Sequence, residues 1–163
     1  MDDPPSSKWE KMVSKRIKEW RLGLDLSALD IIVTDQLNRL GSHGLPLTRE
    51  LIGVGSSALI YRYTVPGRGS EPMSLVARVI YPRQPYWKTK AEAAVMNLVR
   101  ARNVPVPKVY QCSLTASDNP VGAEWILMEY MAGERLDDVF DSPEFTMDKK
   151  KRVIRDLRST SER

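Results

Sequence analysis

The spacing of hydrophobic residues changes near residue 47. Before that point, apolar side chains recur every three or four positions, which predicts amphipathic helices over residues 8–21 and 25–41. Ser27 is expected to cap the second helix and Gly41 to end it. The predicted buried stripes are Trp9, Met12, Val13, Ile17 and Trp20 in the first helix, and Leu29, Ile32, Val33, Leu37 and Leu40 in the second.

After residue 47, short apolar runs are separated by glycine and proline, which predicts strands joined by turns. One segment, residues 86–102, instead contains strong helix formers and no glycine or proline, and its predicted buried side is Ala91, Ala94, Val95 and Leu98. Two short helical segments are expected to finish the chain. The five predicted strands are residues 48–55, 58–65, 74–81, a strand within 104–114, and 123–131.

This order of elements predicts an α+β fold. We expect a five-stranded, mostly antiparallel sheet with one packed helix, preceded by two N-terminal helices. The chain has 163 residues, which is enough for one domain with its own hydrophobic core. Residues 1–7 are acidic and rich in proline and serine, and we expect them to form a disordered tail.

Charge and composition narrow the classes of function only modestly. The net charge is +4, but the densest basic cluster, "DKKKRVIRDLR", is interrupted by acids, which favours a solvated helix face over a nucleic-acid site. No apolar run is long enough to span a membrane, and the N-terminus does not resemble a secretory signal. Cys112 is the single cysteine and cannot form an internal disulfide, so we expect a reducing, cytoplasmic location.

The stretch "GVGSSALIY" carries the first candidate chemistry. Gly53 and Gly55 allow the backbone to approach a ligand closely and to adopt positive φ, and the hydroxyls of Ser56 and Ser57 can add hydrogen-bond donors. These residues are therefore candidates for covering the phosphates of a nucleotide. A plain hairpin turn fits the same four residues, and the stretch alone does not decide between the two interpretations.

The predicted strand "SLVARVIY" contains a second candidate for ligand binding, Arg78. Alternation places Leu75, Ala77 and Val79 on one face of the strand, and Arg78 on the other face between Val76 and Ile80. An arginine among apolar neighbours needs an anion, either a ligand or an acidic side chain. The alternative is a surface arginine on an exposed face of the sheet.

These motifs occur in a recognisable order. Together with the opening glycines, "KAEAAVMNLVRARNVPVPKVYQCSL" and "WILMEYMAGERLDDVF" resemble the N-terminal lobe of the kinase-like aminoglycoside phosphotransferase (APH) family, in particular its fungal-type members, over residues 47–158. The resemblance implies a protein-kinase-like N-lobe that binds ATP. It implies that Gly53, Gly55, Ser56 and Ser57 cover the phosphates and that Arg78 contacts them.

The resemblance also implies partners for these residues. Glu92 is expected to form an ion pair with Arg78, although local pairing with Lys88 on the same helix is an alternative. The backbone of Glu129, Tyr130 and Met131 is expected to offer a free strand edge to adenine. The apolar residues of the preceding strand, Trp125, Ile126 and Met128, are expected to be core residues.

The family's catalytic residues lie in its C-lobe, and they include a His-x-Asp loop, a downstream Asn and a metal-binding Asp. The only histidine here, His43, precedes the glycine stretch, and Asp137, Asp138, Asp141 and Asp148 match no metal motif. We therefore assign no catalytic and no metal-binding residues, and expect Mg²⁺ only with a complete C-lobe. The expected organisation is a tail (1–7), a helical segment (8–46), a nucleotide-binding lobe (47–131), and a hinge with partial C-lobe helices (132–163).

Three hypotheses remain. The first is the ATP-binding half of a small-molecule phosphotransferase, truncated and inactive alone. The second is a non-catalytic lobe that binds nucleotide or docks onto a protein partner through the surface that would otherwise face a C-lobe. The third, a nucleic-acid-binding protein, rests only on net charge and is disfavoured.

Overall fold

The computed structural model describes residues 8–67, 69 and 71–161, with side chains described for 15–67, 69 and 71–156. The predicted tail, residues 1–7, lies outside the described residues. The elements are α1 (Lys8–Leu22), α2 (Leu26–Arg39), β1 (Thr48–Val54), β2 (Ala58–Val65), β3 (Met73–Ile80), α3 (Trp87–Ala101), β4 (Val109–Ser113), β5 (Glu124–Glu129), α4 (Leu136–Val139) and α5 (Met147–Ser161).

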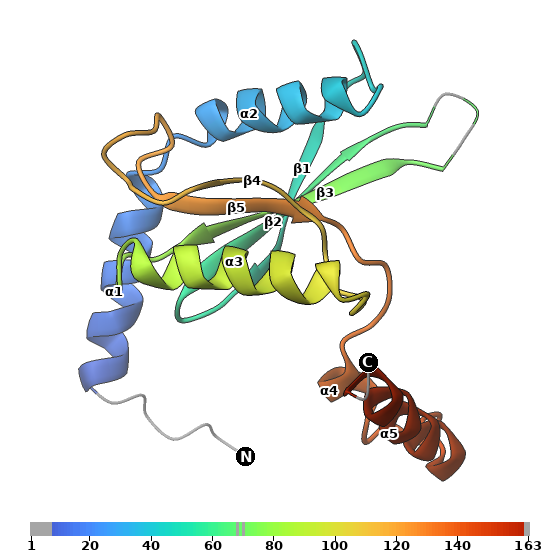
Figure 1. Cartoon of the computed structure of the whole chain (residues 1–163). Coiled ribbons are helices and arrows are strands. Elements are labelled where there is room, and N and C mark those ends of the chain that lie inside the picture. Colours follow the sequence, from blue (N-terminus) through green and yellow to red (C-terminus); the bar gives the residue numbers. More distant parts are fainter. Residues whose placement is uncertain (1–7, 68, 70, 162–163) are drawn as a thin grey trace.

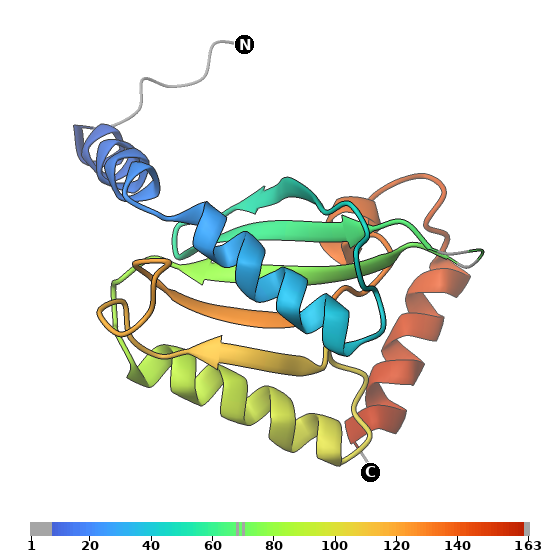
Figure 2. The same ribbon diagram turned by 90° about the horizontal axis from the view of Figure 1, so that it is seen from above.

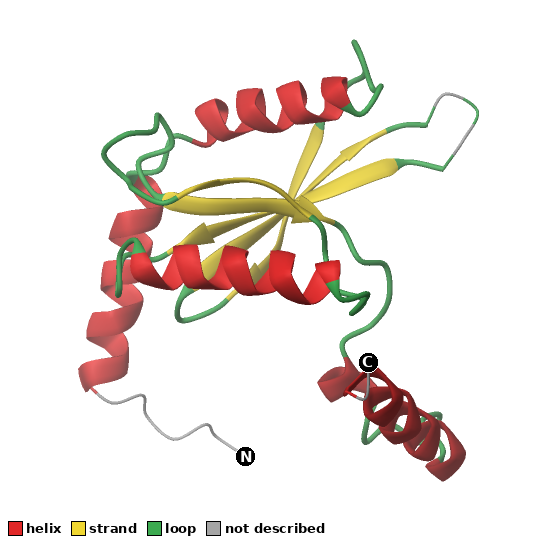
Figure 3. Ribbon diagram, in the orientation of Figure 1, coloured by secondary structure: helices red, strands yellow, loops and turns green. Residues whose placement is uncertain are grey.

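The five strands form one sheet in the order β1-β2-β3-β5-β4, and all four pairings are antiparallel (Figure 3). Strand β5 therefore lies between β3 and β4, although it follows β4 in the chain. The α+β prediction is confirmed. The register places Arg78 in the middle of the sheet, opposite Ile60 on β2 and Ile126 on β5.

The two faces of the sheet are covered by different helices. Helix α2 lies across one face and α3 across the other (Figures 1 and 2). The larger core lies under α2, where Leu29, Val33 and Leu37 pack against the sheet, so the apolar side predicted for this helix is confirmed. The alternation predicted for β3 is also confirmed, because Leu75, Ala77 and Val79 face this core while Val76 and Ile80 join a smaller cluster with Ala93, Ile126 and Met128 on the α3 face.

The start of α2 differs from the prediction. The helix begins at Leu26, and the N-cap is Asp25, whose Oδ1 accepts a hydrogen bond from the Ala28 N–H at 2.9 Å. Ser27 lies inside the first turn, so the prediction that it caps the helix is wrong. Both residue types favour this position, but the cap lies two residues before the predicted Ser27.

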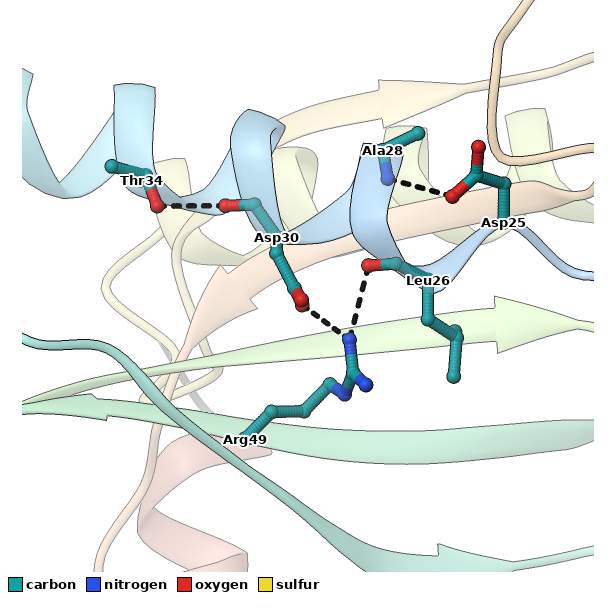
Figure 4. Close-up of polar contacts among 6 residues, drawn as sticks. All are labelled: Asp25, Leu26, Ala28, Asp30, Thr34 and Arg49. Carbon is teal, nitrogen blue, oxygen red and sulfur yellow. Dashed lines mark hydrogen bonds and ion pairs between the residues drawn. The ribbon is translucent and has the colours of Figure 1, made fainter.

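An arginine ties α2 to the edge strand. Nη1 of Arg49, on β1, contacts Oδ1 of Asp30 at 2.5 Å and donates to the Leu26 carbonyl at 3.0 Å (Figure 4). Within α2, the Thr34 hydroxyl donates to the carbonyl of Asp30 at 2.8 Å. The guanidinium therefore bridges a carboxylate and a backbone acceptor in the first turn of the helix.

The buried side predicted for α3 is wrong. Ala91, Ala94, Val95 and Leu98 are exposed, with Val95 and Leu98 each 56% exposed. The sheet-facing side instead carries Thr89 and Ala93, which are buried, and Glu92 and Met96, which are half-buried. Polar side chains occupy the protected side because they have partners on the sheet, as described below.

Helices α1, α4 and α5 lie beyond the three layers formed by α2, the sheet and α3 (Figure 1). Trp20 of α1 packs edge-on against Tyr81, with ring centroids 5.2 Å apart, while Trp9, Met12 and Val13 lie outside the described side chains. Helices α4 and α5 follow the end of β5 (Figure 1), and α5 has 15 residues, so it is longer than the short segment predicted. Among the described residues, no helix is both long and apolar enough to cross a membrane.

Candidate functional site

An ion pair between β3 and α3 lies at the centre of the candidate site. Nη1 of Arg78 is 2.8 Å from Oε1 of Glu92, and the two side chains are 27% and 24% exposed. Arg78 is held in place by the register, which sets it between Ile60 and Ile126 on the face that α3 covers. The ion pair that the family resemblance implied is therefore present.

The guanidinium of Arg78 is only partly used by this pair. Its Nε is buried and has no hydrogen-bond partner among the described residues. A buried N–H without an acceptor costs about 1–3 kcal/mol, so such a group calls for an explanation. The exposed part of the same guanidinium can meet an anionic ligand, because arginine presents several N–H donors in a planar fork suited to phosphate or carboxylate.

The end of strand β1, just before the β1–β2 turn, lies on the same row of the sheet as Arg78. Gly53 is opposite Ile60, which is in turn opposite Arg78, and the pairing between Leu51 and Gly53 is shifted by a bulge. A Cβ on Gly53 would approach Cγ1 of Ile60 at 3.3 Å, so a larger residue would crowd this strand pair. Gly53 thus provides close packing between the strands near the arginine.

The turn itself is a tight hairpin. The Gly55 N–H donates to the Ala58 carbonyl at 2.9 Å, and the Ser57 carbonyl accepts from the Tyr81 N–H at 2.9 Å. Gly55 and Ser56 are exposed. Neither Gly53 nor Gly55 adopts positive φ, so the expectation that these glycines serve that purpose is wrong. The role of this turn in covering phosphates stays a prediction.

The adenine edge was predicted at the end of β5. The Glu129 N–H donates to the Lys108 carbonyl at 2.8 Å, and its carboxylate accepts from the Lys108 N–H at 3.0 Å and pairs with Arg100 at 3.2 Å. Its N–H and side chain are therefore occupied. The next two residues, Tyr130 and Met131, form no backbone–backbone hydrogen bond with any described residue.

A further cation and several buried apolar residues adjoin this edge. The guanidinium of Arg62 lies over the ring of Tyr130, 4.2 Å from its centroid. Trp125, Ile126 and Met128 are buried, which confirms that they belong to the core. The open part of the edge is therefore the backbone of Tyr130 and Met131, while contact between adenine and any of these residues stays a prediction.

Glu124, at the start of β5, was not singled out from the sequence. It is only 4% exposed, its Oε1 accepts the Tyr86 N–H at 2.7 Å, and its Oε2 accepts the Thr89 hydroxyl. Tyr86 and Thr89 lie at the start of α3, so this carboxylate joins the helix of Glu92 to the sheet. The sequence did contain a signal for this role, because Glu124 directly precedes the apolar run "WILM". An acid next to a buried strand needs hydrogen-bond donors nearby.

The sequence of residues 48–158 matches the profile of the Phosphotransferase enzyme family (APH). The chain belongs to this family. The match includes the glycine turn, the Arg78–Glu92 pair and the open edge after β5, so the geometry described above lies within the phosphotransferase region of the chain.

Individual relatives match shorter parts of the chain. Two subtelomeric hrmA-associated cluster proteins of Aspergillus fumigatus, from strains CBS 144.89 and ATCC MYA-4609, are each 42% identical over 72 residues, which is 42% of this chain and 14% of each relative. A crystal structure of a "putative aminoglycoside phosphotransferase" from Ralstonia eutropha JMP134 aligns with 68% of this chain and 29% of its own, at 24% identity and a TM-score of 0.46. The matched region is thus well under two thirds of each of these proteins.

Phosphotransferases of this family generally use ATP. Arg78 carries the kind of planar donor fork that suits an anionic phosphate. Among the described residues there is no group of three or more His, Cys, Asp or Glu side chains that could hold a metal ion.

Proposed function

We propose that this chain is the ATP-binding half of a small-molecule phosphotransferase. The observation that carries the proposal is Arg78, whose guanidinium is fixed by Glu92 at 2.8 Å while its buried Nε has no partner among the described residues. An arginine that is both oriented and incompletely bonded is prepared to receive an anion.

Binding follows from the positions of three features. The Arg78 fork contacts the phosphates, and Glu92 keeps it aimed without neutralising all of its donors. The exposed turn at Gly55 and Ser56 covers the same phosphates with backbone N–H groups and a hydroxyl. The unpaired backbone of Tyr130 and Met131 bonds the adenine edge, at the opposite end of β5 from Glu124.

Transfer of phosphate needs further groups. An acceptor hydroxyl must be oriented, and Mg²⁺ must be held against the phosphates. The resemblance implies that a His-x-Asp loop and a later Asp do this in the family, and the one histidine, His43, is followed by Gly44 and Leu45. We assign to this chain nucleotide binding and not transfer, and expect it to show no phosphotransferase activity alone.

A second candidate function is docking onto a protein partner. The outer side of α3 presents Trp87, Val95 and Leu98, which are 73%, 56% and 56% exposed, along one helix. Exposed apolar residues that gather on one surface often mark an interaction site. A stand-alone lobe would use this surface for a partner, with or without nucleotide.

The proposal is tested by isothermal titration calorimetry of the full chain with Mg-ATP and with adenosine. Wild-type protein is expected to bind ATP more tightly than adenosine. Arg78→Ala should remove about 1.5–3 kcal/mol of that difference, roughly tenfold or more in ATP affinity, and leave adenosine unchanged.

Arg49→Ala is the matched control, because the Arg49–Asp30 pair has similar exposure, 31% and 37%, but lies beside α2. It should leave both affinities unchanged. Equal ATP affinity in wild-type and Arg78→Ala protein would contradict the proposal. Absence of ATP binding, together with capture of a partner through α3, would favour the docking function.

A further inference from the structure

The start of α3 has a strained backbone. Tyr86 has φ 67° and ψ −64°, and the Trp87 N–H donates to the Pro85 carbonyl at 2.8 Å, which together describe a γ-turn with positive φ at its centre. Such turns are rare and cost of order 1–3 kcal/mol, so they persist only where the surroundings hold them. Tyr86 also provides no side-chain cap for the helix that follows.

A carboxylate from another element instead bonds the N-terminal end of α3. Glu124 of β5 accepts the backbone N–H of Tyr86 at 2.7 Å and the hydroxyl of Thr89, and both Glu124 and Thr89 are buried. A carboxylate at a helix N-terminus also interacts favourably with the helix dipole. One buried side chain thus holds the strained turn, the first turn of α3 and the start of strand β5 together.

This contact lies beside the ion pair of the candidate site. Thr89 and Glu92 are three residues apart on α3, or about 4.5 Å along the helix. On the sheet, Glu124 is two residues from Ile126, which is directly opposite Arg78. The Glu124–Thr89 and Glu92–Arg78 contacts therefore join α3 to the same sheet face, one after the other.

The other end of α3 has a weaker connection. Arg100 pairs with Glu129 at 3.2 Å, but these side chains are 42% and 38% exposed. Ion pairs with this degree of exposure contribute little, about 0–1 kcal/mol. The buried contact at Glu124 is thus the stronger of the two attachments, and it is the one nearer to Glu92 in the sequence.

We infer that Glu124 is a positioning residue for the phosphate-binding arginine. By capping α3 and holding its strained entry turn, it sets where Glu92 lies and therefore where the guanidinium of Arg78 points. Glu124 itself touches no nucleotide. This role rests on the proposed function, in which Arg78 contacts the phosphates.

The first test needs no nucleotide. In a ¹⁵N-labelled full chain, the Nε–H signal of Arg78 is identified by its loss in Arg78→Ala. Glu124→Ala should shift or broaden this signal. Glu124→Gln should leave it close to the wild-type position, since the amide oxygen still accepts the Tyr86 N–H and Thr89 can reverse its hydrogen bond.

Asp118→Ala is the matched control. Asp118 accepts the hydroxyls of Thr115 and Ser117 at 3.0 and 3.1 Å in the β4–β5 connection, so its loss also removes a carboxylate bonded to a threonine. It should leave the Arg78 signal unchanged. If Glu124→Ala does not fold, Thr89→Val replaces it, because this substitution removes only the hydroxyl and keeps the side chain's shape.

The second test measures affinities for ATP and adenosine. Glu124→Ala should lower the ratio of ATP to adenosine affinity by roughly tenfold, the lower end of what loss of a supporting partner costs a metal ligand. Glu124→Gln should restore most of the ratio. In an Arg78→Ala background, Glu124→Ala should have no further effect on the ratio, because the two changes act on one group.

The outcomes separate this inference from the proposed function. An unchanged Arg78 signal in folded Glu124→Ala, or equal loss of ATP and adenosine affinity, would overturn the positioning role while Arg78→Ala still tests ATP binding. A shifted signal in a chain that shows no preference for ATP over adenosine would support the positioning of Arg78 and reject phosphate as its ligand.

Discussion

Two ion pairs, one on each face of the sheet, use the same chemistry in different ways. Arg49–Asp30 lies on the α2 side and Arg78–Glu92 on the α3 side, and each joins a strand to a helix. The exposures are similar, 31% and 37% in the first pair and 27% and 24% in the second. Burial alone therefore does not distinguish them.

The two pairs differ in the hydrogen bonds that each guanidinium forms in addition to its ion pair. Arg49 adds a backbone acceptor, the Leu26 carbonyl at 3.0 Å, whereas Arg78 has a buried Nε with no partner among the described residues. The first arrangement ties a helix to a strand. The second has an unused donor in the middle of the sheet, which is the property expected of a binding residue.

The largest contrast between the two faces is expected in their helices. Leu37 of α2 is 1% exposed, so Leu37→Ala should lower the free energy of unfolding by about 2–5 kcal/mol through lost burial and a residual cavity. Leu98→Ala on the outer side of α3 is the control and should change it by less than about 0.5 kcal/mol. Urea denaturation measures both. Similar losses would mean that the outer side of α3 is covered in solution.

The next contrast concerns the ion pairs. Arg49→Ala should lower the free energy of unfolding by about 1 kcal/mol, because a partly exposed pair and its backbone bond are lost. ATP affinity, measured on the same protein, should not change. A fall in ATP affinity without further loss of stability would remove the distinction between the two arginines.

The smallest expected effect is on pH dependence. Burial, followed by the negative charge of Asp30, raises the pKa of Tyr63 above its ordinary value of 10.0. The folded state therefore keeps the phenol proton that the unfolded chain loses near pH 10, so this contribution to stability is complete below that pH and declines as the pH rises. Unfolding free energies at about pH 8 and about pH 11 measure the decline. Tyr63→Phe should reduce it, and an unaltered slope would contradict the assignment.

Much of the fold could be predicted from local pattern. The change from helical spacing to alternation located the strands, and the alternation of β3 correctly separated Ala77 from Arg78. These succeeded because a strand with one face on each of two cores must alternate, and because α2 has a single apolar stripe around Leu29 and Val33. The Arg78–Glu92 contact came from the family resemblance and not from the pattern.

Local pattern failed where partners come from elsewhere in the chain. The prediction chose the sheet-facing side of α3 from its apolar residues. In the structure Thr89 and Glu92 face the sheet, because they bond Glu124 and Arg78 there. Neither partner can be deduced from the helix itself. The apolar residues that misled the prediction, such as Val95, satisfy the helix pattern without having a core to enter.

The glycine stretch shows a different limit. The identity of Gly53 and Gly55 predicted a turn correctly, but not the reason for glycine, which at Gly53 is close contact with Ile60 and not positive φ. Composition can indicate where a chain reverses. It does not reveal which neighbouring side chain makes a larger residue unsuitable.

The position of β5 has a consequence for folding kinetics. Strands β1, β2 and β3 pair with their neighbours in sequence, as do β4 and β5, but β3 and β5 join only when the chain between Ile80 and Glu124 is closed into a loop. Such long-range pairing is slow compared with local hairpins. Because Arg78 lies opposite Ile126, and Glu124 opposite Ile80, we expect the candidate site to assemble in this last step. If the chain binds nucleotide as proposed, a stopped-flow signal from bound nucleotide would report completion of folding, and no hairpin intermediate would contain the site.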